Sequence, residues 1–136
     1  MNISLRAGDK LYLNGAVIQV DRKVSIELLN KVKFLLGTHV LQAADANTPL
    51  RQIYFVVQTM LMDPSSTQIT LALARKMILD AIEAFENPAI LAELKHVDEM
   101  VSLGQCYDAM KALRGLFERE RDIMFPRANL ATPDAA

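Results

Sequence analysis

An apolar run framed by two prolines constrains this chain more than any other stretch. In "ANTPLRQIYFVVQTMLMDP", residues 46–64, the dipeptide Thr48-Pro49 opens the run and Pro64 closes it. Thr48 or Asn47 can serve as the helix N-cap, and proline is tolerated in the first turn because the N–H that it lacks would have no partner there. The run is also longer than an ordinary strand. It therefore predicts a helix that ends at the second proline.

The helical period continues after this run. Apolar residues recur at three- and four-residue steps, and a cap or a stop signal bounds each stretch. The expected helices run from a Ser65 or Ser66 cap to about Phe85, from Asn87-Pro88 to Gly104, and from about Cys106 to a point before Pro126. Together with the first run they predict a four-helix bundle.

The first part of the chain has a different period. Asn14-Gly15 lies between two alternating runs. This pattern favours a two-residue hairpin with a type I′ turn, since both turn residues need positive φ. Such a turn fixes the register, with Leu13 opposite Ala16 and Lys10 opposite Gln19. Further strands are expected around Ile3 and Leu5, in "VSIELL" and in "VKFLL".

The two periods predict an α+β chain. Residues 1–46 are expected to form a small antiparallel β-sheet or partly closed barrel of four to six strands, and residues 47–125 the C-terminal four-helix bundle. The tail, 126–136, has no periodicity and is expected to be disordered. Val17 and Leu35 are apolar but point outward, so they are candidate contacts for the helices or for another subunit.

Composition narrows the class of protein. The chain is 51% hydrophobic, yet its apolar runs fall well short of the roughly 20 residues that span a bilayer. The first ten residues have no signal-peptide pattern, and the single cysteine fits a reducing compartment, so we expect a cytoplasmic protein. The net charge of −1 is unlike that of a dedicated nucleic-acid binder. Residues 1–46, however, hold six Lys and Arg against four Asp and Glu, so the β-rich part alone could present a basic face.

Four stretches carry a resemblance to a known family. They are "GDKLYLNGAVI" in the hairpin, "ANTPLRQIYFVVQTMLMDP" in the first helix, "NPAIL" in the third and "YDAMKALRGLFERE" in the last. In these stretches the chain resembles the FlbT family of flagellin regulators from flagellated α-proteobacteria, over about residues 5–120. The resemblance implies a post-transcriptional regulator of flagellum assembly, which associates with the untranslated leader of flagellin mRNA and promotes its degradation. It also implies a functional partnership with the small flagellar protein FlaF, and some members act positively on flagellin expression.

A weaker likeness concerns the hairpin alone. "LRAGDKLYLNGAVIQV" is similar to the opening of the carbon storage regulator CsrA, an mRNA-binding translational repressor. Arg6 and Gly8-Asp9 carry the match, and the rest of the chain departs from it. The likeness directs attention to this face of the hairpin.

An RNA-binding face needs cations for phosphates and flat groups for stacking. The outward strand positions and turns of the β-rich part offer both; the candidates are Arg6, Lys10, Tyr12, Arg22, Lys23, Lys31 and Lys33. The alternative is that these are ordinary solvated charges, with lysines that discourage edge pairing. No sequence motif of a known RNA-binding module indicates which RNA would be bound.

A protein-binding module is the alternative function. Methionine side chains adapt to many partners, so a methionine-lined groove in the helical half could hold an amphipathic helix. The candidate partner-binding residues are Tyr54, Met60, Met62 and Met110. On this hypothesis the protein holds FlaF or flagellin and acts on mRNA indirectly, although methionine at helical spacing is more often core.

Catalysis has little support in the sequence. His39 and His96 lack ligand-spaced partners, Cys106 lies on an apolar helix stripe, and Glu118 and Glu120 are expected on solvated helix faces. There is no phosphate-binding glycine loop or nucleophile motif. We therefore expect no enzyme, no cofactor and no metal.

Overall fold

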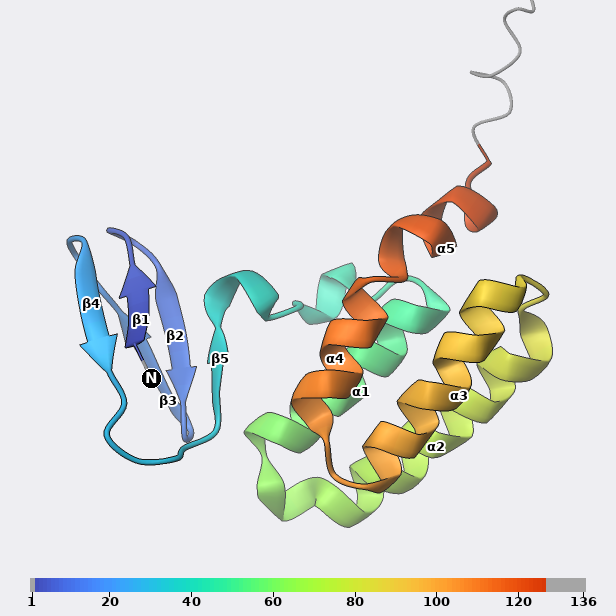
Figure 1. Ribbon diagram of the computed structural model, residues 1–136, viewed down its shortest axis with the longest axis horizontal. Helices are drawn as coiled ribbons and strands as arrows, with labels where there is room; N and C mark the ends of the chain where they lie inside the picture. Colours follow the sequence, from blue (N-terminus) through green and yellow to red (C-terminus); the bar gives the residue numbers. More distant parts are fainter. Residues whose placement is uncertain (1, 127–136) are drawn as a thin grey trace, which may run out of the picture.

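The computed structural model describes residues 2–126 and is α+β, with the strands first and the helices after them (Figure 1). The strands are β1 (Asn2–Leu5), β2 (Lys10–Leu13), β3 (Ala16–Gln19), β4 (Val24–Glu27) and β5 (Phe34–Leu36). The helices are α1 (Pro49–Met62), α2 (Thr67–Ala84), α3 (Pro88–Ser102), α4 (Cys106–Arg114) and α5 (Phe117–Met124). Short 3-10 turns are η1 (Gly37–His39), η2 (Ala43–Asp45) and η3 (Pro64–Ser66). No helix within this described range is long and apolar enough to cross a membrane.

The strands form two small open sheets. β1 pairs with β4, and β2 lies between β3 and β5, with all neighbours antiparallel. The two sheets share a small core around Ile3, Leu5 and Leu11. The expectation of antiparallel strands is confirmed, and the partly closed barrel is replaced by this pair of open sheets.

The hairpin has the register that its turn predicts. Leu13 pairs with Ala16 and Lys10 with Gln19. Asn14 has φ of 49° and Gly15 of 89°, as a type I′ turn requires. The Asn14-Gly15 turn was sufficient to predict the pairing of β2 with β3, because a two-residue loop allows only one register.

The helical core is built around α1. Helices α1 to α4 pack against one another, and the expected α1 stripe of Leu50, Ile53, Tyr54, Val57 and Leu61 is buried throughout. Leu35 of β5 joins this core, and Tyr12 of β2 packs against it. The helix-facing side of the three-stranded sheet therefore docks on the bundle, as expected for Leu35.

Two of the expected helix caps are confirmed. The Thr48 hydroxyl accepts a hydrogen bond from the Arg51 N–H at 3.2 Å, and the Asn87 side chain accepts from two N–H groups at the start of α3. Ser66 occupies the N-cap position of α2, but its hydroxyl donates to the Asp63 carbonyl instead of capping the helix. That bond belongs to η3, which closes the link between α1 and α2.

The expected fourth helix is divided. α4 ends at Arg114 and α5 begins at Phe117, with Gly115 and the buried Leu116 between them. The Leu116 N–H donates to the Leu113 carbonyl in a tighter turn. Figure 1 shows α5 turning away from the axis of α4 at this point. The turn brings α5 to the start of α1, where Phe117 packs edge-on against Tyr54.

Tyr107 joins the helices to the sheet. Its hydroxyl on α4 donates to the Phe34 carbonyl and accepts from the Phe34 N–H, so it satisfies both backbone groups of that residue. Burial raises the pKa of Tyr107, against the effect of the Phe34 hydrogen bond, which lowers it. One side chain thus occupies a pairing position on the outer edge of β5.

We expect Tyr107→Phe to lower the free energy of unfolding by about 1–2 kcal/mol, because it removes two hydrogen bonds while the ring still packs. Urea unfolding measures the change. Tyr107→Leu removes the ring as well and should cost more. A Phe variant as stable as the wild type would show that the hydroxyl does not hold the sheet.

Candidate nucleic-acid interface

Four predicted cations gather at one end of the strands, and we call this group, Arg6, Lys10, Arg22 and Lys23, the cationic end. β1 ends at Leu5 opposite Val24, which places Arg6 beside Lys23. The two loops at this end are tied together, since the Gly8 N–H donates to the Val20 carbonyl at 2.8 Å and the Val20 N–H to the Asp9 carbonyl at 3.2 Å. All four cationic residues are exposed.

An open hollow of about 530 Å³ lies at the cationic end. Its lining combines cations with neutral polar side chains: Ser4, Arg6, Lys10, Tyr12, Thr38 and Gln42. Asp9 also borders it, and its carboxylate accepts a hydrogen bond from the Arg6 N–H at 2.8 Å. Cations and hydroxyl or amide groups are what a sugar-phosphate chain uses, so the hollow has the chemistry for a nucleic-acid backbone.

Arg22, one of the four residues of the cationic end, forms an ion pair with its neighbour Asp21. Its Nε lies 3.1 Å from Asp21 Oδ1, with the two side chains 77% and 82% exposed. Exposed pairs of this kind contribute only about 0–1 kcal/mol. The guanidinium can therefore exchange this carboxylate for a phosphate at little cost.

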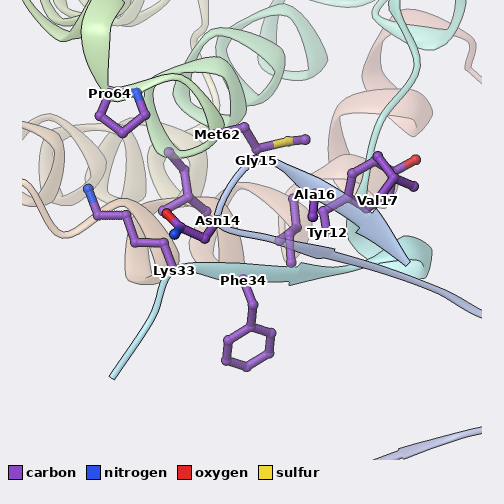
Figure 2. A pocket seen from close by; sticks show the side chains of 11 residues that line it. Tyr12, Asn14, Gly15, Ala16, Val17, Lys33, Phe34, Met62 and Pro64 are labelled. Carbon is purple, nitrogen blue, oxygen red and sulfur yellow. The ribbon is translucent and has the colours of Figure 1, made fainter. Parts of the chain in front are cut away.

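The structure does not bring all seven predicted residues into one site. Lys31 and Lys33 lie at the opposite end of the strands, where the Asn14 N–H donates to the Lys33 carbonyl at 3.0 Å. A four-residue strand is about 13 Å long, so these lysines are separated from the cationic end by about that distance. Figure 2 shows Lys33 beside a second hollow, near Met62 and Pro64, with Phe34 pointing away from it.

Tyr12 is placed between the two groups. It is half-buried and packs against the helical core, and it borders both hollows. Alternation along the strand puts Tyr12 on the outward face, which is the face that docks on the helices. Its ring is therefore only partly accessible to a ligand in this arrangement.

The predicted partner-binding residues do not form a surface groove. Tyr54, Met60 and Met110 are at most 4% exposed and belong to the helical core, whereas Met62 is half-buried and lines the second hollow. The Tyr54 hydroxyl donates to the His39 carbonyl and accepts from Arg114. In the described structure these side chains hold the bundle together.

Glu120 is the polar group for which the sequence-based prediction is wrong. As a charged residue it is expected on a solvated face, although its spacing also allows a place on the apolar stripe of the last helix, and its side chain is fully buried. One carboxylate oxygen accepts from the Thr48 hydroxyl at 2.5 Å and the other from the Leu50 N–H at 2.7 Å. A carboxylate from α5 thus caps α1, where the helix dipole favours negative charge.

Gln58 holds the segment that leads from the sheet to the helices. This buried residue of α1 pairs with the backbone of Leu41, accepting from its N–H at 2.8 Å and donating to its carbonyl at 2.9 Å. The amide therefore acts like one rung of a β-ladder and fixes the linker on the bundle.

We expect Gln58→Leu to destabilise the protein by about 2–4 kcal/mol, because the Leu41 N–H and carbonyl lose their partners at a half-buried position. The free energy of unfolding in urea measures this. Gln52→Leu, at an exposed position of the same helix, is the matched control and should change it by less than about 0.5 kcal/mol. Equal effects of the two variants would contradict the proposed role of Gln58.

The surroundings of His39 lead us to expect that stability depends on pH. Burial, and then the nearby charge of Arg114, lower the pKa of His39 below its usual value of 6.5. Because the folded state disfavours the charged ring, the contribution to stability is present above the unfolded pKa and is lost as the pH falls through the folded pKa. We expect the free energy of unfolding to drop between about pH 7.5 and about pH 5, and His39→Asn to reduce that drop. Urea unfolding at the two pH values tests this, and an unchanged drop in the variant would contradict it.

The described residues contain no cluster of side chains suited to a metal ion. Within residues 2–126, no group of three or more His, Cys, Asp or Glu side chains is placed to hold a metal ion. Cys106 is buried, with its sulfur 3.7 Å from that of Met60, and burial raises the pKa of its thiol, which the nearby Lys33 charge opposes. A buried thiol with a raised pKa is a weak nucleophile, so we interpret it as a packing residue.

Comparisons with known proteins agree on one family. A family model described as "Flagellar protein FlbT" matches residues 1–124. A relative from Chelativorans sp. (strain BNC1), named "Probable flagellum biosynthesis repressor protein FlbT", is 57% identical over 122 residues, which cover 90% of this chain and 84% of the relative. Relatives of the same name are 49% identical in Allorhizobium ampelinum and 45% identical in Agrobacterium fabrum, each over 91% of this chain and 83% of the relative.

No solved structure matches the chain significantly. Residues 46–64, one of the stretches on which the resemblance to this family rests, contain Thr48, Tyr54 and Gln58, which cap α1 and hold the linker. With its match to the family model and its close relatives, the chain belongs to the FlbT family of flagellar proteins.

Proposed function

We propose that this protein acts in the cytoplasm as a post-transcriptional regulator of flagellin expression during flagellum biogenesis. In this proposal it binds the untranslated leader of flagellin mRNA and promotes the degradation of that mRNA. Family membership supports the flagellar role, since the curated relatives are named flagellum biosynthesis repressors. The clustering of four exposed cations at the cationic end supports RNA as the ligand.

The arrangement suits a phosphate backbone better than a base-specific contact. Arg6 and Lys10 border the hollow, and Arg22 and Lys23 extend the positive surface along the neighbouring loop. Phosphate contacts contribute affinity but no sequence information. Selectivity would then come from the fold of the leader, with neutral groups such as Thr38 and Gln42 positioned to read its 2′-hydroxyls.

The test is fluorescence anisotropy of a labelled flagellin leader titrated with purified protein, with a scrambled RNA of equal length as control. The proposal expects tighter binding of the leader than of the scrambled RNA. Equal affinity for both, or no binding of either, would reject direct and selective recognition.

A second candidate function is an adaptor that holds FlaF or flagellin. The observation that favours it is on α2, where Ile69 and Leu73 lie one turn apart and are 77% and 45% exposed. An exposed apolar pair at this spacing fits an amphipathic partner helix. Stoichiometric binding of FlaF or flagellin that Ile69→Lys abolishes, without any RNA affinity, would favour this function over the first.

A further inference from the structure

Strand β3 has an open outer edge. Val20 follows β3, and both its N–H and its carbonyl bond to the chain before β2. The direction of the backbone groups alternates along a strand, so those of Ala16 and Ile18 also face β2. The backbone groups of Val17 and Gln19 therefore point outward. β3 also has no buried side chain, and Val17 is 61% exposed. Its sequence, "AVIQ", has no proline and no charged residue, which are the usual protections of an edge.

The other edge of the same sheet is closed. There the Tyr107 hydroxyl bonds to both backbone groups of Phe34. The three-stranded sheet therefore has one edge that cannot accept a further strand at its centre and one that can. A new strand would add beside β3.

The core between the two sheets is small. Its buried residues are Ile3, Leu5 and Leu11, and the side chains packed around them are only half-buried, including Ile18 and Val20 of the β3 segment. A unit of about 45 residues is close to the size below which a domain needs further support, such as oligomerisation. Covering the β3 edge would extend this core on the side of Ile18.

We propose that two copies of this chain pair through β3 in antiparallel orientation, with Ile18 on the twofold axis. In this register Val17 faces Gln19 of the second copy and exchanges two hydrogen bonds with it, and the symmetric pair does the same. Ala16 faces Val20, and Ile18 faces Ile18. The strand complements itself because no like charges oppose one another, and the product is a continuous six-stranded sheet.

Sedimentation velocity over a range of concentrations tests whether two copies pair through the β3 edge. The wild type should form a dimer of twice 15.2 kDa. Val17→Lys and Val17→Pro should be monomeric with unchanged circular dichroism, since the Val17 N–H points away from β2 and a proline there removes no bond within the hairpin. Leu29→Lys makes the same change at a site that is 86% exposed in a loop, and it should stay dimeric. A monomeric wild type, or a dimer that survives both Val17 variants, would overturn the proposal.

A disulfide between two copies tests the proposed register of the β3–β3 pairing. In a Cys106→Ser background, the Ile18→Cys variant carries a single cysteine and should crosslink two copies on mild oxidation. The reason is that directly opposed residues that do not exchange hydrogen bonds lie about 4.5 Å apart at Cα. Ala16→Cys in the same background is the control, since its opposite residue is Val20, and it should crosslink far less. A dimer in which the Ala16→Cys variant crosslinks faster than the Ile18→Cys variant would overturn the register.

Discussion

Replacing Glu120 with alanine should lower the free energy of unfolding by about 3–5 kcal/mol and the Tm by roughly 10–20 °C. The carboxylate is fully buried and accepts hydrogen bonds from the Thr48 hydroxyl and the Leu50 N–H. Its removal leaves both donors without a partner in the core, and it removes the negative charge at the start of α1. Because α5 meets α1 through this contact, the loss should be seen in the whole bundle.

Two further variants test whether this loss comes from the hydrogen bonds of the Glu120 carboxylate. Glu120→Gln keeps the size and one acceptor oxygen, so it should cost less, about 1–2 kcal/mol. Glu118→Ala removes an exposed carboxylate from the same helix and should change stability by less than about 0.5 kcal/mol. Thermal and urea unfolding measure all three. If Glu120→Ala were as mild as Glu118→Ala, the capping role would be rejected.

The second large effect concerns RNA. Changing Arg6, Lys10 and Lys23 together to Gln should weaken binding of the flagellin leader by roughly 10- to 100-fold, since three exposed charge contacts contribute about 0.5–1 kcal/mol each. All three residues are exposed, so the fold should be retained. Anisotropy titrations at one salt concentration give the ratio, and circular dichroism checks the fold.

The matched control removes three cations from the helices. Arg75, Lys76 and Lys95 are also exposed, and two of them are in surface ion pairs with Asp98 and Asp80. Changing these three to Gln alters the net charge by the same amount, away from the cationic end. An equal loss of affinity in both triple variants would mean that overall charge, and not this surface, attracts the RNA.

Local signals explain how much of the fold could be predicted. The turn at Asn14-Gly15 fixed the hairpin register, and the caps at Thr48 and Asn87 fixed the starts of α1 and α3. Each of these signals acts within a few residues. The same short sequences would predict the same turn and caps in another chain.

Long-range contacts explain what could not be predicted. Glu120 is buried because the turn after Arg114 carries α5 to a helix start 72 residues earlier in the chain. The separation into two sheets depends on β1 pairing with β4 and not with β2, and no short turn determines that choice.

The candidate site shows the same division. Strand alternation correctly indicated that the six cations are exposed. It could not indicate that Lys31 and Lys33 lie at the opposite end from Arg6 and Lys10, because this depends on the order of the strands in space. It did indicate Leu35 as a candidate contact with the helices, and the face that Leu35 shares with Tyr12 is the one that meets them.

The most direct test of the RNA-binding account is the salt dependence of leader binding. The dissociation constant would be measured by anisotropy across a series of salt concentrations for the wild type and for the Arg6, Lys10 and Lys23 triple variant. With about three to four phosphate contacts, the plot of log affinity against log salt should have a slope of about −2 to −3, and the triple variant should lose about two units of that slope. A slope near zero, or the same slope in both proteins, would contradict the assignment of RNA binding to the cationic end.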